Sequence, residues 1–121
     1  MSEQSLPHHH HDEKVQRRIV SDMPDNETIA AVSEALKQLG DPSRLRIFWL
    51  LCHTEECVLD IAALVGMSSP AVSHHLRLLK AAGLLDTRRV GKEVYYRAAD
   101  SDLVRKLHTT IEEVARISCP D

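Results

Sequence analysis

The chain has 121 residues, which is enough for one domain with a single small core and too few for two. Hydrophobic residues make up 43% and aromatic residues 3%, and the apolar runs are far shorter than the roughly 20 residues that cross a bilayer. We therefore predict a soluble protein with no membrane partner. Residues 1–14 lack the apolar core of a secretory signal, so we expect a cytoplasmic location and reduced cysteines.

The formal net charge of −3 is unusual for a protein that binds nucleic acid, but the charges are unevenly distributed. The segment from His74 to Arg97 has a net charge of +4, and the remainder of the chain −7. Its basic residues are Arg77, Lys80, Arg88, Arg89, Lys92 and Arg97. A basic surface on an acidic body can release counterions from a phosphate backbone while the protein stays soluble. An ordinary solvated surface is the alternative.

The first 26 residues are predicted to form a flexible arm. They are polar, show no apolar period, and contain two prolines and a run of four histidines. From Thr28 to Leu39 apolar residues recur at helical spacing, and Gly40 supplies a stop. We therefore divide the chain into an arm at residues 1–26, a folded domain at 27–118 and a short tail at 119–121.

Asp41 and Pro42 are predicted to open a second helix. An N-cap carboxylate accepts a hydrogen bond from a free amide, and proline gives up a donor that has no partner at this position. This helix is expected to run to about His53. Its predicted core-facing residues are Leu45, Phe48, Leu51 and Cys52.

Two shorter helices are predicted next, at about residues 58–65 and 69–82. Gly66 ends the first, and Ser69 before Pro70 repeats the cap signal and opens the second. Their predicted core-facing residues are Ile61, Ala62, Val65, Val72, Leu76 and Leu79. Because only residues 66–68 separate these helices, we predict a helix-turn-helix.

A two-stranded wing and a final helix complete the predicted domain. In residues 84–99, Leu85, Thr87 and Arg89 occupy alternate positions, and strong strand formers follow. Gly91 and Lys92 are predicted to form the turn of a β-hairpin. The final helix, at about residues 102–118, carries an apolar stripe. The expected fold is mainly α with a small β-hairpin wing, a winged helix-turn-helix. The core is too small to cover that stripe, so we predict a homodimer through the first and last helices.

Three stretches of the chain resemble the ArsR/SmtB family of metal-sensing repressors. They are LGDPSRLRIFWLL at 39–51, ECVLDIAALVGMSSPAVSHHLRLLKAAGLL at 56–85 and GKEVYYRAAD at 91–100. Members of this family are winged-helix dimers that repress genes for metal efflux or sequestration, and metal binding weakens their hold on the operator. The resemblance implies a transcriptional repressor that binds double-stranded operator DNA as a homodimer, is released by a transition metal and takes no small organic substrate.

The predicted recognition helix begins with polar side chains, and such residues face base edges in the major groove. Relatives often have glutamine at the position of His75, so the operator sequence stays open. A generic amphipathic helix with serine caps is the alternative. The DNA-binding residues that the resemblance implies on this helix are Ser68, Ser69, Ser73, His74, His75 and Arg77. On the wing, Arg88, Arg89 and Lys92 are predicted to contact the DNA backbone.

The family places metals at two main sites, and the chain fits the first of them. There the pattern supplies a cysteine and an aspartate three residues later, here Cys57 and Asp60, with further donors from the arm of the other subunit. The arm offers His8, His9, His10 and His11. One thiolate, one carboxylate and two imidazoles would complete a tetrahedral zinc site. Cadmium- and lead-sensing relatives often have a second cysteine where this chain has Leu59, so we expect Zn(II), with Cd(II), Pb(II), Co(II) and Ni(II) as alternatives.

Both parts of this site have an ordinary alternative interpretation. Cys57 could be a small buried hydrophobe, as most free cysteines are. The histidine run could be an expression tag or a solvated tract, although seven residues precede it, which is unusual for a tag. Which of the histidines bind stays open.

The second family site, across paired final helices, is altered in this chain. The family pattern has an aspartate and a histidine at the start of this helix, then a histidine and a carboxylate or second histidine further on. Only Asp100 fits this pattern. Asp102 and Glu113 replace the two histidines, and Arg116 puts a cation at the last ligand position. We therefore interpret this site as lost or altered. The candidate ligands that remain near it are Asp100, Asp102, His108, Glu112 and Glu113.

Two pairs of possible ligands have one-turn spacing. His108 and Glu112 could bind a metal or merely pair with each other. His53 and Cys57 share the same spacing, but we expect a helix to end between them.

Two other functions remain open. One is a thiol-redox repressor on the same fold that uses Cys52, Cys57 or Cys119, although no cationic motif would activate a thiol. The other is a histidine-rich metal-buffering protein whose DNA motif is idle. We do not expect an enzyme, because the chain offers no phosphate loop, nucleophile elbow or paired acid and base. Ser73 and His74 are only neighbours on a helix and do not face each other.

Overall fold

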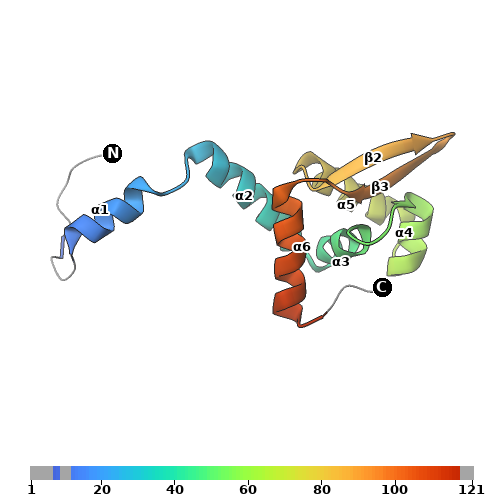
Figure 1. Ribbon diagram of the computed structural model, residues 1–121. Helices are drawn as coiled ribbons and strands as arrows, with labels where there is room; N and C mark the ends of the chain where they lie inside the picture. The colour runs from blue at the N-terminus through green and yellow to red at the C-terminus, as the bar shows by residue number, and fades with distance from the viewer. Residues whose placement is uncertain (1–6, 9–11, 118–121) are drawn as a thin grey trace. The chain divides into compact units, whose positions relative to one another are not determined.

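The computed structural model describes residues 7–8 and 12–117 (Figure 1). The chain divides into two compact units, residues 1–30 and 31–121. No helix within the described part is long and apolar enough to span a membrane. In chain order the elements are α1 (Glu13–Ser21), α2 (Asn26–Leu39), α3 (Pro42–Leu51), β1 (Glu56–Cys57), α4 (Val58–Val65), α5 (Ser69–Ala81), β2 (Leu85–Val90), β3 (Glu93–Ala98) and α6 (Asp102–Ala115).

Helix α1 lies within residues 1–26, the stretch predicted to form a flexible arm, where the sequence shows no apolar period. The side chain of Asp12 caps the helix by accepting a hydrogen bond from the amide of Lys14 at 2.9 Å. Val15 and Ile19 lie one turn apart but are 50% and 62% exposed. The helix is short and capped, and none of its residues is buried. The sequence therefore shows no apolar period that would predict it.

Helix α2 confirms the first predicted helix and leaves much of its apolar surface exposed. Ala35 is fully buried and Gln38 is 5% exposed, so the C-terminal part of the helix packs on the core. Ile29, Val32 and Leu36 are 47%, 38% and 54% exposed. The helix thus has one face packed on the core and an apolar face that remains exposed.

Helices α3 and α4 form the base of the core. Asp41 caps α3 as predicted, because its carboxylate accepts a hydrogen bond from the amide of Arg44 at 3.0 Å, which lowers the pKa of Asp41. The helix ends at Leu51, before the predicted end at His53. Helix α4 has its predicted bounds and ends at Gly66, whose φ of 68° favours glycine. The fully buried side chains Ile47, Phe48 and Ile61 lie at the centre of the core.

Helix α5 follows α4 after a short turn, which confirms the helix-turn-helix. Its N-cap is Ser68 and not Ser69, because the Ser68 hydroxyl accepts the hydrogen bond from the amide of Ala71 at 3.3 Å. The predicted core positions are correct: Val72 and Leu79 are fully buried, and Leu76 is 1% exposed. The opposite face of α5 is therefore free to meet another molecule.

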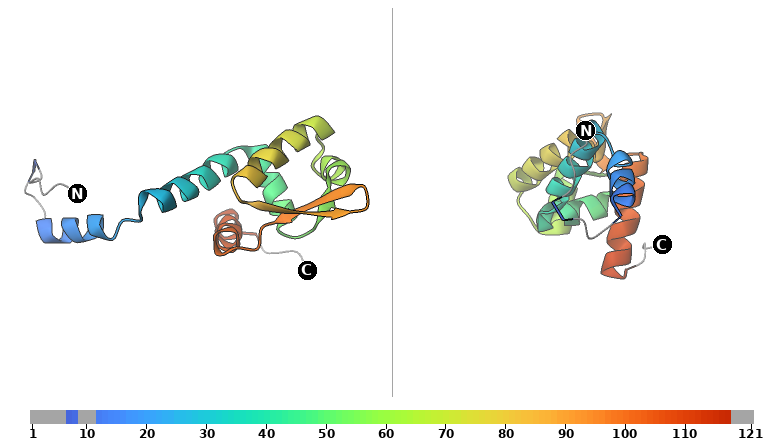
Figure 2. Two further views of the ribbon diagram at one scale, coloured as in Figure 1. Left: turned by 90° about the horizontal axis from the view of Figure 1, so that it is seen from above. Right: turned by 90° about the vertical axis from the view of Figure 1, so that its left-hand side faces the viewer.

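The wing has three strands, where the sequence predicted a two-stranded hairpin. The strand order is β1-β3-β2, and all pairs are antiparallel. Glu56 pairs with Tyr96 and Cys57 with Tyr95, so the end of the loop after α3 is hydrogen-bonded to the wing. Two residues are too few to show an alternating pattern, and the added strand was missed for that reason. In both Figure 1 and the left view of Figure 2 the hairpin tip points away from α6.

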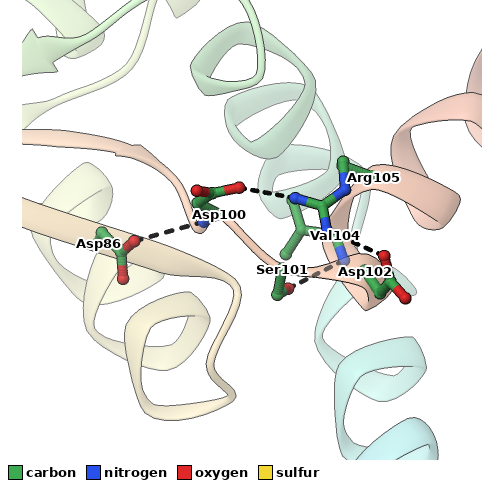
Figure 3. Close-up of polar contacts among 6 residues, drawn as sticks. All are labelled: Asp86, Asp100, Ser101, Asp102, Val104 and Arg105. Atoms are coloured by element: carbon green, nitrogen blue, oxygen red, sulfur yellow. Dashed lines mark hydrogen bonds and ion pairs between the residues drawn. The ribbon is translucent and has the colours of Figure 1, made fainter.

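Helix α6 is the predicted final helix, and its apolar stripe divides into two parts. The hydroxyl of Ser101 caps the helix by accepting a hydrogen bond from the amide of Val104 at 3.2 Å (Figure 3). Leu103, Leu107 and Ile111 pack against the core of the subunit together with the buried Val104. Beyond them, Val114 is 79% exposed and Ile117 is 47% exposed.

Candidate nucleic-acid interface and metal ligands

One face of α5 points outward and carries positive charge. The burial of Val72, Leu76 and Leu79 places His74, Arg77 and Lys80 on the exposed side of the helix, which we call the outward face of α5. Lys80 belongs to the basic segment but was not predicted as a site residue. It lies one turn after Arg77 and extends the same surface. The N-terminal Ser68 is exposed, while Ser69 and Ser73 are half-buried.

His75 is anchored inside the subunit. Its Nδ1 atom lies 3.3 Å from Nη1 of Arg44, and because a guanidinium has donors only, the imidazole accepts this hydrogen bond. Arg44 also donates from Nε to the carbonyl oxygen of Gln38 at 2.8 Å. These contacts tie α5 to the junction of α2 and α3. His75 therefore helps to orient the recognition helix, and its reading of bases stays a prediction.

The wing contributes three further basic residues in two different settings. Arg88 forms an ion pair with Glu55, its Nε lies 3.1 Å from Oε1 of that residue, and its guanidinium carbon lies 6.0 Å from the centre of the Tyr95 ring. Arg89 and Lys92 are exposed, Arg89 on β2 and Lys92 in the turn. Arg88 thus attaches the wing to the loop after α3, and Arg89 and Lys92 are available to a phosphate backbone.

The pairing with Arg88 changes the pKa of the Glu55 carboxyl group. The hydrogen bond from Arg88 lowers the pKa of Glu55, with smaller contributions from the charges of Arg88 and Arg97, against desolvation that raises it. The charged form of Glu55 is therefore favoured in the folded protein. Its contribution to stability is present at neutral pH and is lost as the pH falls through the lowered pKa.

The predicted first metal site is only partly within the described residues. Cys57 is 8% exposed, lies in β1 and precedes α4, while Asp60 is exposed in the first turn of that helix. Cys57 is the extended N-cap residue of α4 and Asp60 is the third residue of the helix, so both lie at its N-terminal end. His8 is exposed, and His9, His10 and His11 lie outside the described residues. The joint site stays a prediction.

The start of α6 holds two of the alternative ligands in an ion-pair network (Figure 3). Arg105 donates from Nη1 to Oδ1 of Asp100 at 2.6 Å and from Nη2 to Oδ1 of Asp102 at 2.9 Å. The hydrogen bond from Arg105 and the nearby charge of Lys106 lower the pKa of Asp102. A metal ion at this place would have to displace a bound guanidinium. Glu113 is exposed further along the helix.

The remaining two alternative ligands meet a residue that was not predicted to join them. Nε2 of His108 lies 3.2 Å from Oε1 of Glu112, which is the one-turn pair expected from their spacing. Helix α3 ends at Leu51, so the helix boundary lies before His53 and not between His53 and Cys57 as expected. Nε2 of His53 lies 3.1 Å from Nε2 of His108 and 3.4 Å from Oε2 of Glu112.

Comparison with known proteins places the chain in a family. A model described as "Bacterial regulatory protein, arsR family" matches residues 41–87. A cadmium resistance transcriptional regulatory protein homolog of Staphylococcus aureus is 40% identical over 90 residues, which cover 71% of this chain and 74% of that protein. The chain belongs to the ArsR family of bacterial regulatory proteins.

One further sequence relative and one solved structure support this assignment. A transcriptional repressor SmtB homolog of Synechocystis is 45% identical over 73 residues, 60% of this chain, and the matched part spans only 55% of that relative's length. A homodimeric winged helix-turn-helix DNA-binding domain from Mycobacterium bovis matches with 34% identity and a TM-score of 0.68, covering 78% of this chain and 88% of that structure. The chain is therefore a winged helix-turn-helix of the ArsR family, and its relatives are named as transcriptional regulators.

The pairing of Arg88 with Glu55 gives a direct test of how the wing is attached. In a carboxyl-detected NMR titration, Glu55 should titrate below its ordinary pKa in the parent protein. Replacing Arg88 by glutamine should return the midpoint toward the ordinary value, because the dominant hydrogen bond is lost. Arg89→Gln, the neighbouring residue on β2, is the matched control and should leave the midpoint lowered. An unchanged midpoint in the Arg88 variant would show that the ion pair is absent in solution.

Proposed function

We propose that this chain is a metal-responsive transcriptional repressor. It binds operator DNA as a homodimer and is released when a transition metal binds, so that genes for metal efflux or sequestration are expressed. The observation that carries the proposal is the outward face of α5, where His74, Arg77 and Lys80 stand exposed on a helix whose other side is buried in the core. The helix-turn-helix, the wing and the family membership support the same conclusion.

The charge distribution explains how an acidic chain can hold DNA. The outward face of α5 would enter the major groove, where Arg77 reads a guanine edge or contacts a phosphate. Arg89 and Lys92 on the wing would contact the backbone and fix the position of the helix without reading sequence. Because the contacts to phosphates release counterions, binding should weaken steeply with salt.

A homodimer explains the apolar surface that the subunit leaves exposed. On α2, Ile29, Val32 and Leu36 are exposed to between 38% and 54%. Val114, near the end of α6, is 79% exposed, and Ile117, just after that helix, is 47% exposed. Such surface would be buried favourably between two copies. The related domain from Mycobacterium bovis is homodimeric. Two copies would present two recognition helices to successive major grooves.

The metal ligands that we propose for release are Cys57 and Asp60, joined by two arm histidines of the partner subunit. A thiolate, a carboxylate and two imidazoles suit tetrahedral Zn(II). A single sulfur ligand makes the site less suited to Cd(II) or Pb(II), although a relative is named for cadmium resistance, and Co(II) or Ni(II) are further candidates. Binding would couple the arm to β1 and α4, and about 1–3 kcal/mol of differential affinity is enough for such a switch.

Arg77 tests the DNA-binding part of the proposal. Arg77→Ala should weaken binding to a fragment of the chain's own promoter by about 1–3 kcal/mol, as measured by fluorescence anisotropy at fixed salt. Lys106→Ala, which removes an exposed charge of the same sign from α6, is the control and should bind almost like the parent. Equal affinities of the two variants would contradict the proposed reading surface.

Cys57 tests the metal-sensing part separately. Cys57→Ser should bind the promoter fragment as tightly as the parent but should not be released by Zn(II), because the thiolate ligand is lost. Cys119→Ser, which leaves the proposed site intact, should still be released. Release of the Cys57 variant at the parent's zinc concentration would refute this ligand set. Release by an oxidant in the presence of a chelator would instead favour the redox alternative, and failure of the parent to bind any promoter DNA would favour metal buffering.

A further inference from the structure

Three potential ligands from two distant parts of the chain meet between α6 and the loop that follows α3. His53 lies directly after α3, and His108 and Glu112 lie one turn apart on α6, which runs next to α3 (Figure 1). Their nearest nitrogen and oxygen atoms are 3.1, 3.2 and 3.4 Å apart. Among the described residues, this is the cluster of three such side chains whose ligand atoms all lie within 4.8 Å of one another.

One ligand atom from each of the three residues can be chosen so that all three lie within 4.8 Å of one another, which is compact enough for a metal centre. Zn(II) binds imidazole nitrogens and carboxylate oxygens at about 2.0–2.2 Å in tetrahedral geometry, so two of its ligand atoms lie about 3.3–3.5 Å apart. The separation of 3.1 Å between the Nε2 atoms of His53 and His108 is close to an edge of that tetrahedron. The carboxylate of Glu112 faces both imidazoles, with Oε1 at 3.2 Å from His108 and Oε2 at 3.4 Å from His53. The imidazole rings of His53 and His108 are nearly perpendicular, at 79°, with centres 4.7 Å apart, so the two rings meet without stacking.

The surroundings of the cluster orient its members. Trp49 donates a hydrogen bond from Nε1 to Oε2 of Glu112 at 3.2 Å, and its ring centre lies 4.5 Å from that of His53. The side chains of His53, His108 and Glu112 are 17%, 21% and 12% exposed. They are thus held by packing while an ion can still reach them from solvent. A donor behind a ligand carboxylate is the outer-shell support that metal sites typically have.

We propose that His53, His108 and Glu112 bind one divalent transition-metal ion in each subunit. Two imidazoles and one carboxylate suit Zn(II), Co(II) or Ni(II), and the fourth position would be taken by water. The site lies within one subunit and uses neither Cys57 nor the arm. It is also separate from the altered pattern of Asp100 and Asp102, whose carboxylates are held by Arg105.

This ion would strengthen a connection that the Trp49–Glu112 and His53–His108 contacts already make between α6 and the end of α3 with its loop. It would fasten α6, whose exposed end we propose as a subunit interface, to the loop that leads from α3 into β1. Metal binding here does not depend on the repressor function. The inference therefore stands or fails independently of the Cys57 site and of DNA binding.

The test uses the full chain in a background that removes the other proposed ligands. In this background His8, His9, His10 and His11 are replaced by glutamine and Cys57 by serine. Zn(II) is titrated by calorimetry, and Co(II) binding is followed by its visible absorption and by the fluorescence of Trp49, the sole tryptophan of the chain. We expect one ion per subunit and a change in Trp49 fluorescence that saturates at the same ratio.

His108→Gln and Glu112→Gln in that background should each weaken zinc binding by more than the roughly 10–100-fold that loss of an outer-shell partner costs. Glu113→Gln, which changes the adjacent exposed carboxylate, is the matched control and should bind like the background. Glu112→Gln keeps an amide oxygen that can accept the hydrogen bond from Trp49, so it decides the test if the His108 variant does not fold. Thermal unfolding without metal reports whether each variant is folded.

Two results would overturn the proposal. One is a background protein that is folded and binds no zinc, which would identify the cluster as a hydrogen-bonded contact between α3 and α6. The other is a Glu112 variant that binds zinc as tightly as the Glu113 control. If Cys57→Ser is no longer released from DNA by zinc but the cluster of His53, His108 and Glu112 still binds zinc, the inference is supported.

Discussion

The loop between α3 and α4, residues 52–57, is held at several points, and this constraint connects the parts of the domain. His53 contacts α6 at its beginning, and Glu55 pairs with Arg88 of the wing in its middle. At its end Cys57 is hydrogen-bonded to β3 and passes directly into α4. A movement of α6 against α3 therefore acts on the loop, and through it on the wing and on the first helix of the helix-turn-helix.

Both metal sites that we propose lie on this loop. The Cys57 site would act at its end, where α4 begins, and the His53 site would act at its beginning, where the loop leaves α3. Since α5 packs on the same core as α3, an ion at either place can favour one orientation of the recognition helices over another. Bound metal and bound DNA would then select different states of one element, which is the physical content of allosteric release.

Local signals in the sequence predicted most of the fold. The cap at Asp41, the stop at Gly66 and the apolar period of α5 each depend on neighbouring residues, and the structure confirms them. The features that were missed depend on contacts over long distances or on short elements: β1 pairs with a strand far along the chain, and His53 meets His108 across 55 residues. Spacing alone identified His108 and Glu112 as a pair, but it could not supply their third partner.

The reciprocity of metal and DNA binding tests the central claim most directly. If zinc weakens the hold on the operator, operator DNA must weaken zinc binding by the same factor, because the two free energies are linked. Zinc affinity of the parent protein should therefore be measured by competition with a chromophoric chelator, with and without saturating promoter DNA. We predict weaker zinc binding in the DNA complex by roughly 5–150-fold. Equal zinc affinity in the free and DNA-bound protein would contradict the account.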